Sequence, residues 1–430
     1  MLRTLNRVVW MVGIGALTAG PVLAQDRDTT AIKRLEGQVE AITRELEELR
    51  LGGDVVAKAD TSVYGFGPAA SKVYKVGQGV SIGGYGEVLY QNFAGSRQDD
   101  APSGATDRFD ALRAIVYVGY KFSDQILFNS EIEVEHGSTG DGGSVSLEFG
   151  YLEYRLSPSL GLRGGLLLAP MGFINEIHEP PTFLGALRPE TERQIIPSTW
   201  RENGIGVFGA TGDVSYRAYL INGFDAGGFR ASGIRGGRQN GAQAAAQNFG
   251  GVGRVDYTGM LGLVVGTSAY LGNSGQGAVL PSDPGRTVGA RTFIWEGHAE
   301  YKAWGFDLRG LVALATLDDA AELNELNGLA GNASVGDRLA GWYVQGGFDV
   351  LRARGGEQQL MPYVRYEQLN TQSRVPAGFT ADPANDRRFI TLGAAWKPLP
   401  NVSLKTDYQI AQNEADTGVN GLNVALGYLF

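Results

Sequence analysis

The sequence predicts an all-β protein: a sixteen-stranded antiparallel transmembrane β-barrel preceded by a short N-terminal coiled-coil helix. Hydrophobic residues make up 43% of the 430 residues and glycines number 64, yet beyond the N-terminus no apolar run is long enough for a membrane helix. From residue 80 onward, segments of about ten residues alternate apolar and polar positions between turns, as in barrels that show every second side chain to lipid.

Residues 1–24 have the features of a secretory signal peptide. Arg3 and Arg7 precede a short apolar core, and the small residues before Gln25 form a cleavage site after Ala24. An uncleaved anchor is the alternative, but several glycines and Pro21 interrupt the apolar stretch that it requires. We therefore expect an exported chain.

Residues 30–51 carry a heptad pattern that predicts a periplasmic coiled-coil helix. The apolar a and d positions, spaced 3, 4, 3, 4 and 3 residues apart, are Ile32, Leu35, Val39, Ile42, Leu46 and Leu49. We expect them to support oligomerisation, with a homotrimer preferred; one amphipathic helix docked on its own barrel is the alternative. Residues 52–79 lack a period and are expected to be a linker.

Residues 80–430 are expected to form an outer-membrane β-barrel. The alternation is clearest in residues 126–136, where Ile126 and Val134 share one face and Glu131 and Glu133 the other. The predicted strands are 80–92, 108–121, 125–136, 144–156, 160–170, 204–211, 213–222, 249–258, 260–270, 291–302, 305–316, 337–352, 358–369, 387–397, 401–411 and 421–430. Short turns between them would face the periplasm and long loops the exterior.

Aromatic residues are predicted on the lipid-facing side, where those near strand ends would form interfacial girdles. They are Phe149, Tyr151, Tyr257, Trp295, Tyr301, Trp342, Trp396, Tyr408 and Tyr428. The chain ends in a strand with one apolar face, and its last residue is Phe430. A terminal aromatic residue after such a strand is typical of the signal that the outer-membrane assembly machinery reads.

One long connection, residues 171–203, cannot be strand because Pro180, Pro181, Pro189 and Pro197 remove ladder hydrogen bonds. Its aromatic and aliphatic residues favour a packed loop over disorder. We expect this loop to fold into the barrel and form a pore constriction. The charged residues expected to line it are Glu176, Glu179, Arg188, Glu190, Glu192, Arg193 and Arg201.

The faces opposite the apolar rows predict the lumen. Acids are expected on the early strands and bases on several others, which would set up a transverse field across the pore. The predicted lumen residues are Glu87, Arg113, Glu131, Glu133, Glu135, Arg163, Arg217, Arg254, Arg309, Arg365 and Lys405. Arginine suits anion binding because its fixed fork matches carboxylate and phosphate; a solvated lumen residue without a specific role is the alternative for each.

Four segments resemble the phosphate-selective porin O/P family and its general-porin relatives. They are SIGGYGEVLYQNF (residues 81–93), residues 108–136, the loop with its flanks from 166 to 209, and the closing NVALGYLF (423–430). The resemblance implies a sixteen-stranded trimeric porin whose third external loop folds inward and whose lumen arginines capture anions.

Composition excludes several other functions. A net charge of −9 argues against a nucleic-acid partner, and the absence of cysteine removes thiol chemistry. Only His136, His178 and His298 are present, so we expect no metal site, no cofactor and no enzyme activity. His178 and Glu179, with Ser198 or Glu176 as companions, are the best catalytic alternative, but no nucleophile motif supports it.

We therefore predict an outer-membrane channel for passive diffusion of small hydrophilic solutes, with a preference for anions. Its partners would be outer-membrane lipid, lipopolysaccharide, the solutes and further copies of the chain. An envelope tether acting through the coiled coil is the alternative, as is a barrel enzyme. Sixteen strands favour the channel because a barrel of that size leaves room for water.

Overall fold

The structure, a computed structural model, describes residues 33–34, 37–40, 61–140 and 142–430. The chain forms two units, Met1–Asp54 and Val55–Phe430. In the first unit the described residues are helical, and the side chain of Val39 is 59% exposed. The signal peptide and the other five heptad residues lie outside the described residues, so the coiled coil stays a prediction. No helix in the described part of the chain is long and apolar enough to cross a membrane.

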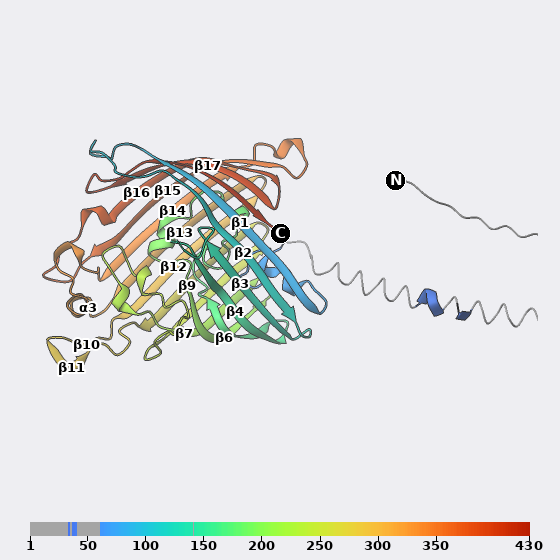
Figure 1. The fold of residues 1–430 in the computed structure, drawn as a ribbon, viewed down its shortest axis with the longest axis horizontal. Coiled ribbons are helices and arrows are strands. Elements are labelled where there is room, and N and C mark those ends of the chain that lie inside the picture. The colour runs from blue at the N-terminus through green and yellow to red at the C-terminus, as the bar shows by residue number, and fades with distance from the viewer. Residues whose placement is uncertain (1–32, 35–36, 41–60, 141) are drawn as a thin grey trace, which may run out of the picture. The chain divides into compact units, whose positions relative to one another are not determined.

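The second unit contains a closed antiparallel barrel (Figure 1), with sixteen strands among the described residues. The strands are β1 (Gly79–Phe93), β2 (Arg108–Lys121), β3 (Ile126–Glu135), β4 (Ser144–Ser157), β5 (Leu160–Leu168), β6 (Arg201–Thr211), β7 (Val214–Asn222), β8 (Phe249–Met260), β9 (Leu263–Asn273), β12 (Arg291–Ala303), β13 (Phe306–Leu317), β14 (Arg338–Phe348), β15 (Gln359–Arg374), β16 (Asp386–Leu399), β17 (Val402–Asn413) and β18 (Gly421–Leu429). Neighbours follow chain order, and β1 closes the barrel against β18.

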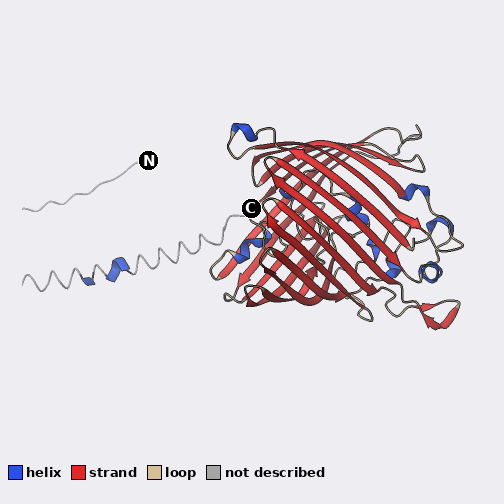
Figure 2. Ribbon diagram, turned by 180° about the vertical axis from the view of Figure 1, so that it is seen from behind, coloured by secondary structure: helices blue, strands red, loops and turns tan. Residues whose placement is uncertain are grey.

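This arrangement confirms the predicted all-β, closed antiparallel barrel and its strand number. The largest boundary differences fall on two neighbours: β14 ends at Phe348 rather than at 352, and β15 ends at Arg374 rather than at 369. Long loops at one end carry α3 (Ala320–Leu326) and a separate hairpin of β10 (Val279–Leu280) and β11 (Asp283–Thr287), opposite the end where the C-terminus lies (Figure 1). The strands slant across the barrel wall, as the view from behind shows (Figure 2).

Side chains alternate between the outer face and the lumen along each strand, which is the pattern a lipid-embedded barrel requires. On β15, Val364 is 47% exposed on the outside whereas Arg365 and Glu367 are buried inside. Most of the predicted lipid-facing aromatics, among them Trp295, Trp342, Trp396 and Tyr428, are exposed on the outer face.

Two of these aromatics, Phe149 and Tyr151, were predicted on the wrong face. Both are buried inside the barrel, where Phe149 packs against Phe66. The pairing of β3 with β4 shifts register between Glu131 and Ile132, so that β4 contains one extra residue there. Such a bulge exchanges the two faces of the strand beyond it.

The connection from β5 to β6 lies inside the barrel. It contains the 3₁₀ turn η3 (Pro180–Thr182) and the short helix α2 (Glu190–Gln194). η3 contacts β18 and β17, and α2 contacts β15 and β14, so the loop crosses the lumen from wall to wall. Its apolar side chains, including Met171, Ile195, Ile196 and Trp200, are buried in the main core of the protein.

Residues 61–78, expected to be part of a linker, instead fold into the lumen beside this loop. The 3₁₀ helix η2 (Ala70–Tyr74) contacts β1, β2 and β3. Phe66 stacks on Tyr151 with ring centroids 5.4 Å apart, and Val73 is buried. The aromatic residues in this glycine-rich stretch explain the difference, because they gain more from burial than a solvated linker would allow.

Candidate functional site: the barrel lumen

The inward loop is fixed at its root by Glu192. The carboxylate of Glu192 accepts hydrogen bonds from the backbone N–H groups of Phe173 and Ile174, both at 2.8 Å, and from the Tyr343 hydroxyl on β14 at 2.6 Å. Its side chain is fully buried, so these donors replace the water that the carboxylate lost. Glu192, predicted to line the constriction, therefore holds the loop together instead of facing a solute.

Wall residues of β13 to β17 bind the loop backbone directly. The donors are Arg309 to the Thr182 carbonyl (2.7 Å), Lys405 to the Gly185 carbonyl (3.0 Å) and Arg365 to the Leu187 carbonyl (3.3 Å). The acceptors are Glu367, from the Thr191 N–H (2.6 Å), and Asp407, from the Ala186 N–H (2.7 Å). Three of the predicted lumen cations thus serve as anchors for the loop.

Glu179 joins the loop to residues 61–78. Its carboxylate accepts hydrogen bonds from the N–H groups of Ala69, at 3.0 Å, and Ala70, at 3.1 Å. Burial raises the pKa of Glu179 to about 7, although these two N–H groups favour the charged form. Asn129 on β3 donates to the Ala70 carbonyl at 3.0 Å, so the same short helix is also tied to the wall.

Glu176 belongs to a buried charge network between the loop and β7, β8 and β12. It pairs with Arg217 at 3.2 Å, and Arg217 also pairs with Asp256 at 2.6 Å. Asp256 in turn pairs with Arg254 at 2.8 Å and with His298 at 2.9 Å. His298 contacts Glu296 at 2.8 Å, and Arg254 donates to the carbonyl of Gly172 at the loop root.

The predicted acidic arc on the early strands is present but largely paired. Arg113 lies 3.2 Å from Glu87 and 3.7 Å from Glu133. Arg201, the first residue of β6 rather than part of the loop, pairs with Glu148 at 2.6 Å. Near the rim, Glu135 accepts a hydrogen bond from the Ser144 hydroxyl at 3.3 Å.

The loop histidine lies against this arc. His178 contacts Glu131 through Nε2 at 3.1 Å and the Asn175 carbonyl through Nδ1 at 3.1 Å. Burial, followed by the charges of Arg188 and Arg113, lowers the pKa of His178 to about 3. At neutral pH the ring is therefore uncharged and serves as a structural contact.

Arg163 is enclosed by aromatic rings. Its guanidinium lies 4.3 Å from the ring centroid of Phe208 and 4.7 Å from that of Phe66, and it pairs with Glu153 at 3.0 Å. A cation sandwiched in this way is stabilised by the faces of the rings. This predicted lumen arginine holds residues 61–78 in place.

A second group of arginines faces the loop end of the barrel. Arg188 and Arg193 belong to the inward loop, Arg235 to the loop between β7 and β8, and Arg387 to the inner face of β16. Arg193 pairs with Glu190 at 2.8 Å. Buried guanidinium nitrogens of Arg188, Arg235 and Arg387 have no hydrogen-bond partner within the described residues. We call Arg188, Arg193, Arg235 and Arg387 the outer arginine cluster.

The members of the cluster influence one another. Burial, then the charges of Arg238, Arg193 and Arg188, lowers the pKa of Arg235 to about 9. Arg188 and Arg193 were predicted as constriction residues, whereas Arg235 and Arg387 were missed. Neither has a local sequence signal: Arg235 lies in a glycine-rich loop, and the inward orientation of Arg387 follows only from the register of β16.

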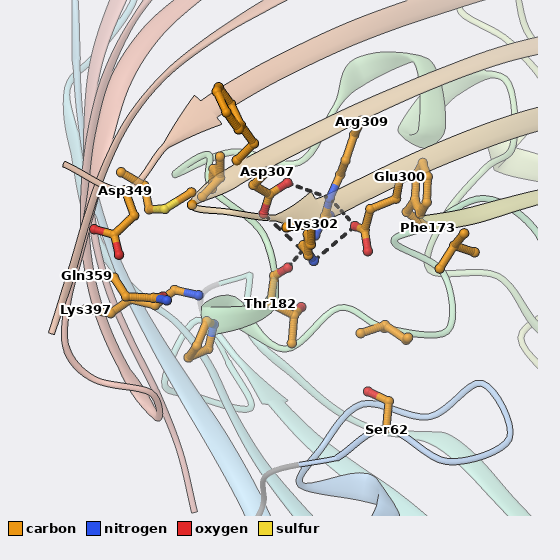
Figure 3. A pocket seen from close by; sticks show the side chains of 18 of the residues that line it. Ser62, Phe173, Thr182, Glu300, Lys302, Asp307, Arg309, Asp349, Gln359 and Lys397 are labelled. Carbon is orange, nitrogen blue, oxygen red and sulfur yellow. Dashed lines mark hydrogen bonds and ion pairs between the residues drawn. The ribbon is translucent and has the colours of Figure 1, made fainter. Parts of the chain in front are cut away.

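An open cavity of about 650 Å³ lies at the opposite, turn-bearing end of the barrel (Figure 3). It is enclosed by η3 and the loop residue Phe173 on one side and by β12, β13, β15 and β16 on the other. Lys302, Arg309 and Lys397 point toward it, together with Glu300 and Asp307 (Figure 3). We call this space the turn-end cavity.

Catalysis finds no support in this geometry. The buried hydroxyl of Ser198 has no hydrogen-bond partner in the described part of the chain, and the contacts of His178 are Glu131 and Asn175. A nucleophile requires a base within hydrogen-bond reach. Within the same residues, no cluster of acidic and histidine side chains could hold a metal ion.

Comparison with solved structures places the fold in the class of outer-membrane porin barrels. OmpF of Salmonella typhi, in complex with daunomycin, superposes with a TM-score of 0.54 at 14% identity, over 82% of this chain and 98% of that chain. The outer membrane channel DcaP of Acinetobacter baumannii gives 0.51 at 11% identity, over 83% and 98%. At these identities the likeness concerns the fold alone.

The chain belongs to the same family as a protein of Aquifex aeolicus (strain VF5) described as an uncharacterized protein. The two are 40% identical over 365 residues, which cover 82% of this chain and 80% of the Aquifex protein. No protein-family profile matches the chain. The resemblance to the phosphate-selective porin O/P family is therefore not confirmed.

Proposed function

We propose that the protein is an outer-membrane porin: a water-filled channel for passive diffusion of small hydrophilic solutes, with a preference for anions, phosphate among them. The closed sixteen-stranded barrel with a loop across its lumen supports the channel. The barrel would lie in outer-membrane lipid next to lipopolysaccharide, and the heptad residues would join three copies in the periplasm.

The outer arginine cluster is the observation that carries the anion preference. Arg188, Arg235 and Arg387 of this cluster carry buried guanidinium nitrogens without a hydrogen-bond partner among the described residues. Such groups raise the free energy of the protein unless a counter-ion approaches them. An oxyanion can accept hydrogen bonds from two guanidinium forks at once. The acids of the early strands compete less for an anion site, because Glu87 and Glu133 lie near Arg113 and Glu148 pairs with Arg201.

The test is the reversal potential of single channels in a planar bilayer under a potassium chloride gradient. We expect the wild type to prefer chloride and added phosphate to reduce its current. The double variant Arg188→Gln, Arg387→Gln should shift the reversal potential toward that of potassium. It removes two fixed positive charges from the loop end of the proposed channel. The matched control Arg97→Gln, Arg286→Gln removes two charges whose side chains form exposed ion pairs in outer loops, and should shift it little.

Two outcomes would contradict this proposal. A wild-type channel that prefers potassium would show that the acidic wall sets the selectivity. A correctly folded barrel that forms no channels at all would contradict the proposed porin function and favour the envelope tether.

A further inference from the structure

We infer that the turn-end cavity binds a small carboxylate that carries an apolar body, forming a solute site within the channel proposed above. This inference rests on that proposed function for its physiological meaning, but the site is defined by its own residues. Its features are a cation without an ion pair, an amide beside that cation and an apolar wall.

Charges along the β12–β13 side of the cavity form ion pairs with one another, whereas Lys397, Asp349 and Arg352 on the other side form none within the described residues. Across β12 and β13, Glu300 is the register partner of Arg309, and Lys302 is the partner of Asp307. These residues form ion pairs, with Lys302 also 3.0 Å from Glu300. Cations and acids therefore neutralise each other along this wall.

Lys397 on β16 has no such partner. Its register partner on β15 is Gln359, a neutral amide, and Figure 3 shows the two side chains next to each other at the cavity. Among the described residues, the Lys397 ammonium takes part in no hydrogen bond and no ion pair. The nearby Asp349 uses one carboxylate oxygen for the N–H groups of Leu351, at 3.0 Å, and Leu360, at 3.1 Å.

The wall beside Lys397 is apolar. Leu184 of the inward loop and Met361 of β15 line the cavity here and belong to one buried hydrophobic cluster. On the side of the inward loop, Phe173 lines the cavity next to Arg309. A volume of about 650 Å³ lies in the range of pockets that hold one small molecule.

These features select for a particular chemistry. A carboxylate could accept hydrogen bonds from the Lys397 ammonium and the Gln359 amide while its hydrocarbon part extends past Met361 toward Phe173 on the side of the inward loop. A small hydrated anion such as chloride or acetate would leave that apolar surface in contact with water, and an uncharged apolar molecule would leave the ammonium unpaired. The site therefore favours molecules that combine both parts.

The experiment measures binding of hexanoate and of acetate to the full-length barrel in amphipol by saturation-transfer NMR. We expect hexanoate to bind and acetate to bind at least about tenfold more weakly. Lys397→Met should weaken hexanoate binding about tenfold, whereas Lys397→Arg should retain it. Arg354→Met is the matched control, because it removes one exposed positive charge from the neighbouring β14–β15 turn without touching the cavity lining.

Equal binding of acetate and hexanoate, or equal binding of hexanoate to the wild type and to a folded Lys397→Met variant, would overturn the inference. Fold is checked by far-ultraviolet circular dichroism and heat-dependent gel mobility. The same hexanoate concentrations are then applied to channels in a bilayer, where we expect them to reduce the current. Channels that conduct while hexanoate fails to bind would overturn the site alone. Lys397-dependent binding to a barrel that never conducts would support the site and contradict the proposed function.

Discussion

Glu179 illustrates how one buried carboxyl group can give the protein a pH-dependent stability. Its pKa is raised by burial from 4.5 to about 7, so between these values the folded protein holds a proton that the unfolded chain releases. The free energy of unfolding should therefore fall as pH rises through this range, by on the order of 3 kcal/mol in total. Below pH 4.5 both states are protonated and the penalty disappears.

Glu179→Gln should remove this contribution. We expect the difference in unfolding free energy between wild type and variant to change from pH 4.5 to pH 8, with the wild type losing more. Urea unfolding in lipid vesicles at several pH values, followed by tryptophan fluorescence, measures it. Parallel pH profiles for the two proteins would mean that Glu179 is more solvated than its contacts with Ala69 and Ala70 indicate.

A substitution at Tyr343 tests how firmly the root of the inward loop is anchored. Tyr343→Phe removes the hydroxyl that donates to the fully buried Glu192 and leaves that carboxylate with one donor fewer, which should cost about 1–3 kcal/mol. Tyr408→Phe is the control, because its ring is 42% exposed on the outer face. The urea midpoint should fall for the first variant only, and an equal shift in both would argue against the anchor.

Among the structural elements, residues 61–78 bear most on function because they occupy the lumen. Replacing 62–78 with a glycine-serine segment of equal length should raise single-channel conductance, because Phe66, Val73 and η2 would leave the turn-bearing end of the barrel. The same replacement of the exposed residues 283–287 of β11 should leave conductance unchanged. If both variants conduct like the wild type, residues 61–78 do not limit the path of ions.

Strand positions were predictable from the sequence because alternation and turn residues are local signals. The side that each residue faces was predictable only where the register is regular, and the extra residue in β4 reversed it for Phe149 and Tyr151. The roles of charged residues depend on contacts across the lumen. Glu192 and Lys405 are anchors because they meet backbone groups far away in the sequence, and no local pattern marks such partners.

In the molecule as a whole, ion pairing distinguishes the charges that hold the structure together from those that can act on a solute. Charges that pair with an opposite charge contribute little to the field that a solute meets, so we expect the cations without an ion pair to set the selectivity of the proposed channel. Among the described residues, the cations without an ion pair include Arg188, Arg235 and Arg387 at one end and Lys397 at the other. We therefore expect a solute in the proposed channel to meet positive charge at both ends.

Assembly is the last property that belongs to the whole molecule, and it rests on the heptad residues. Ile42→Asp places a charge at a d position and should dissociate the expected trimer in detergent, because a buried charge without a partner is costly. Ala41→Asp adds the same charge at the neighbouring solvent-facing c position and should leave the trimer intact. Light scattering coupled to size-exclusion chromatography measures both. A trimer that survives Ile42→Asp would place the subunit contacts in the barrel wall and leave the heptads as a single helix.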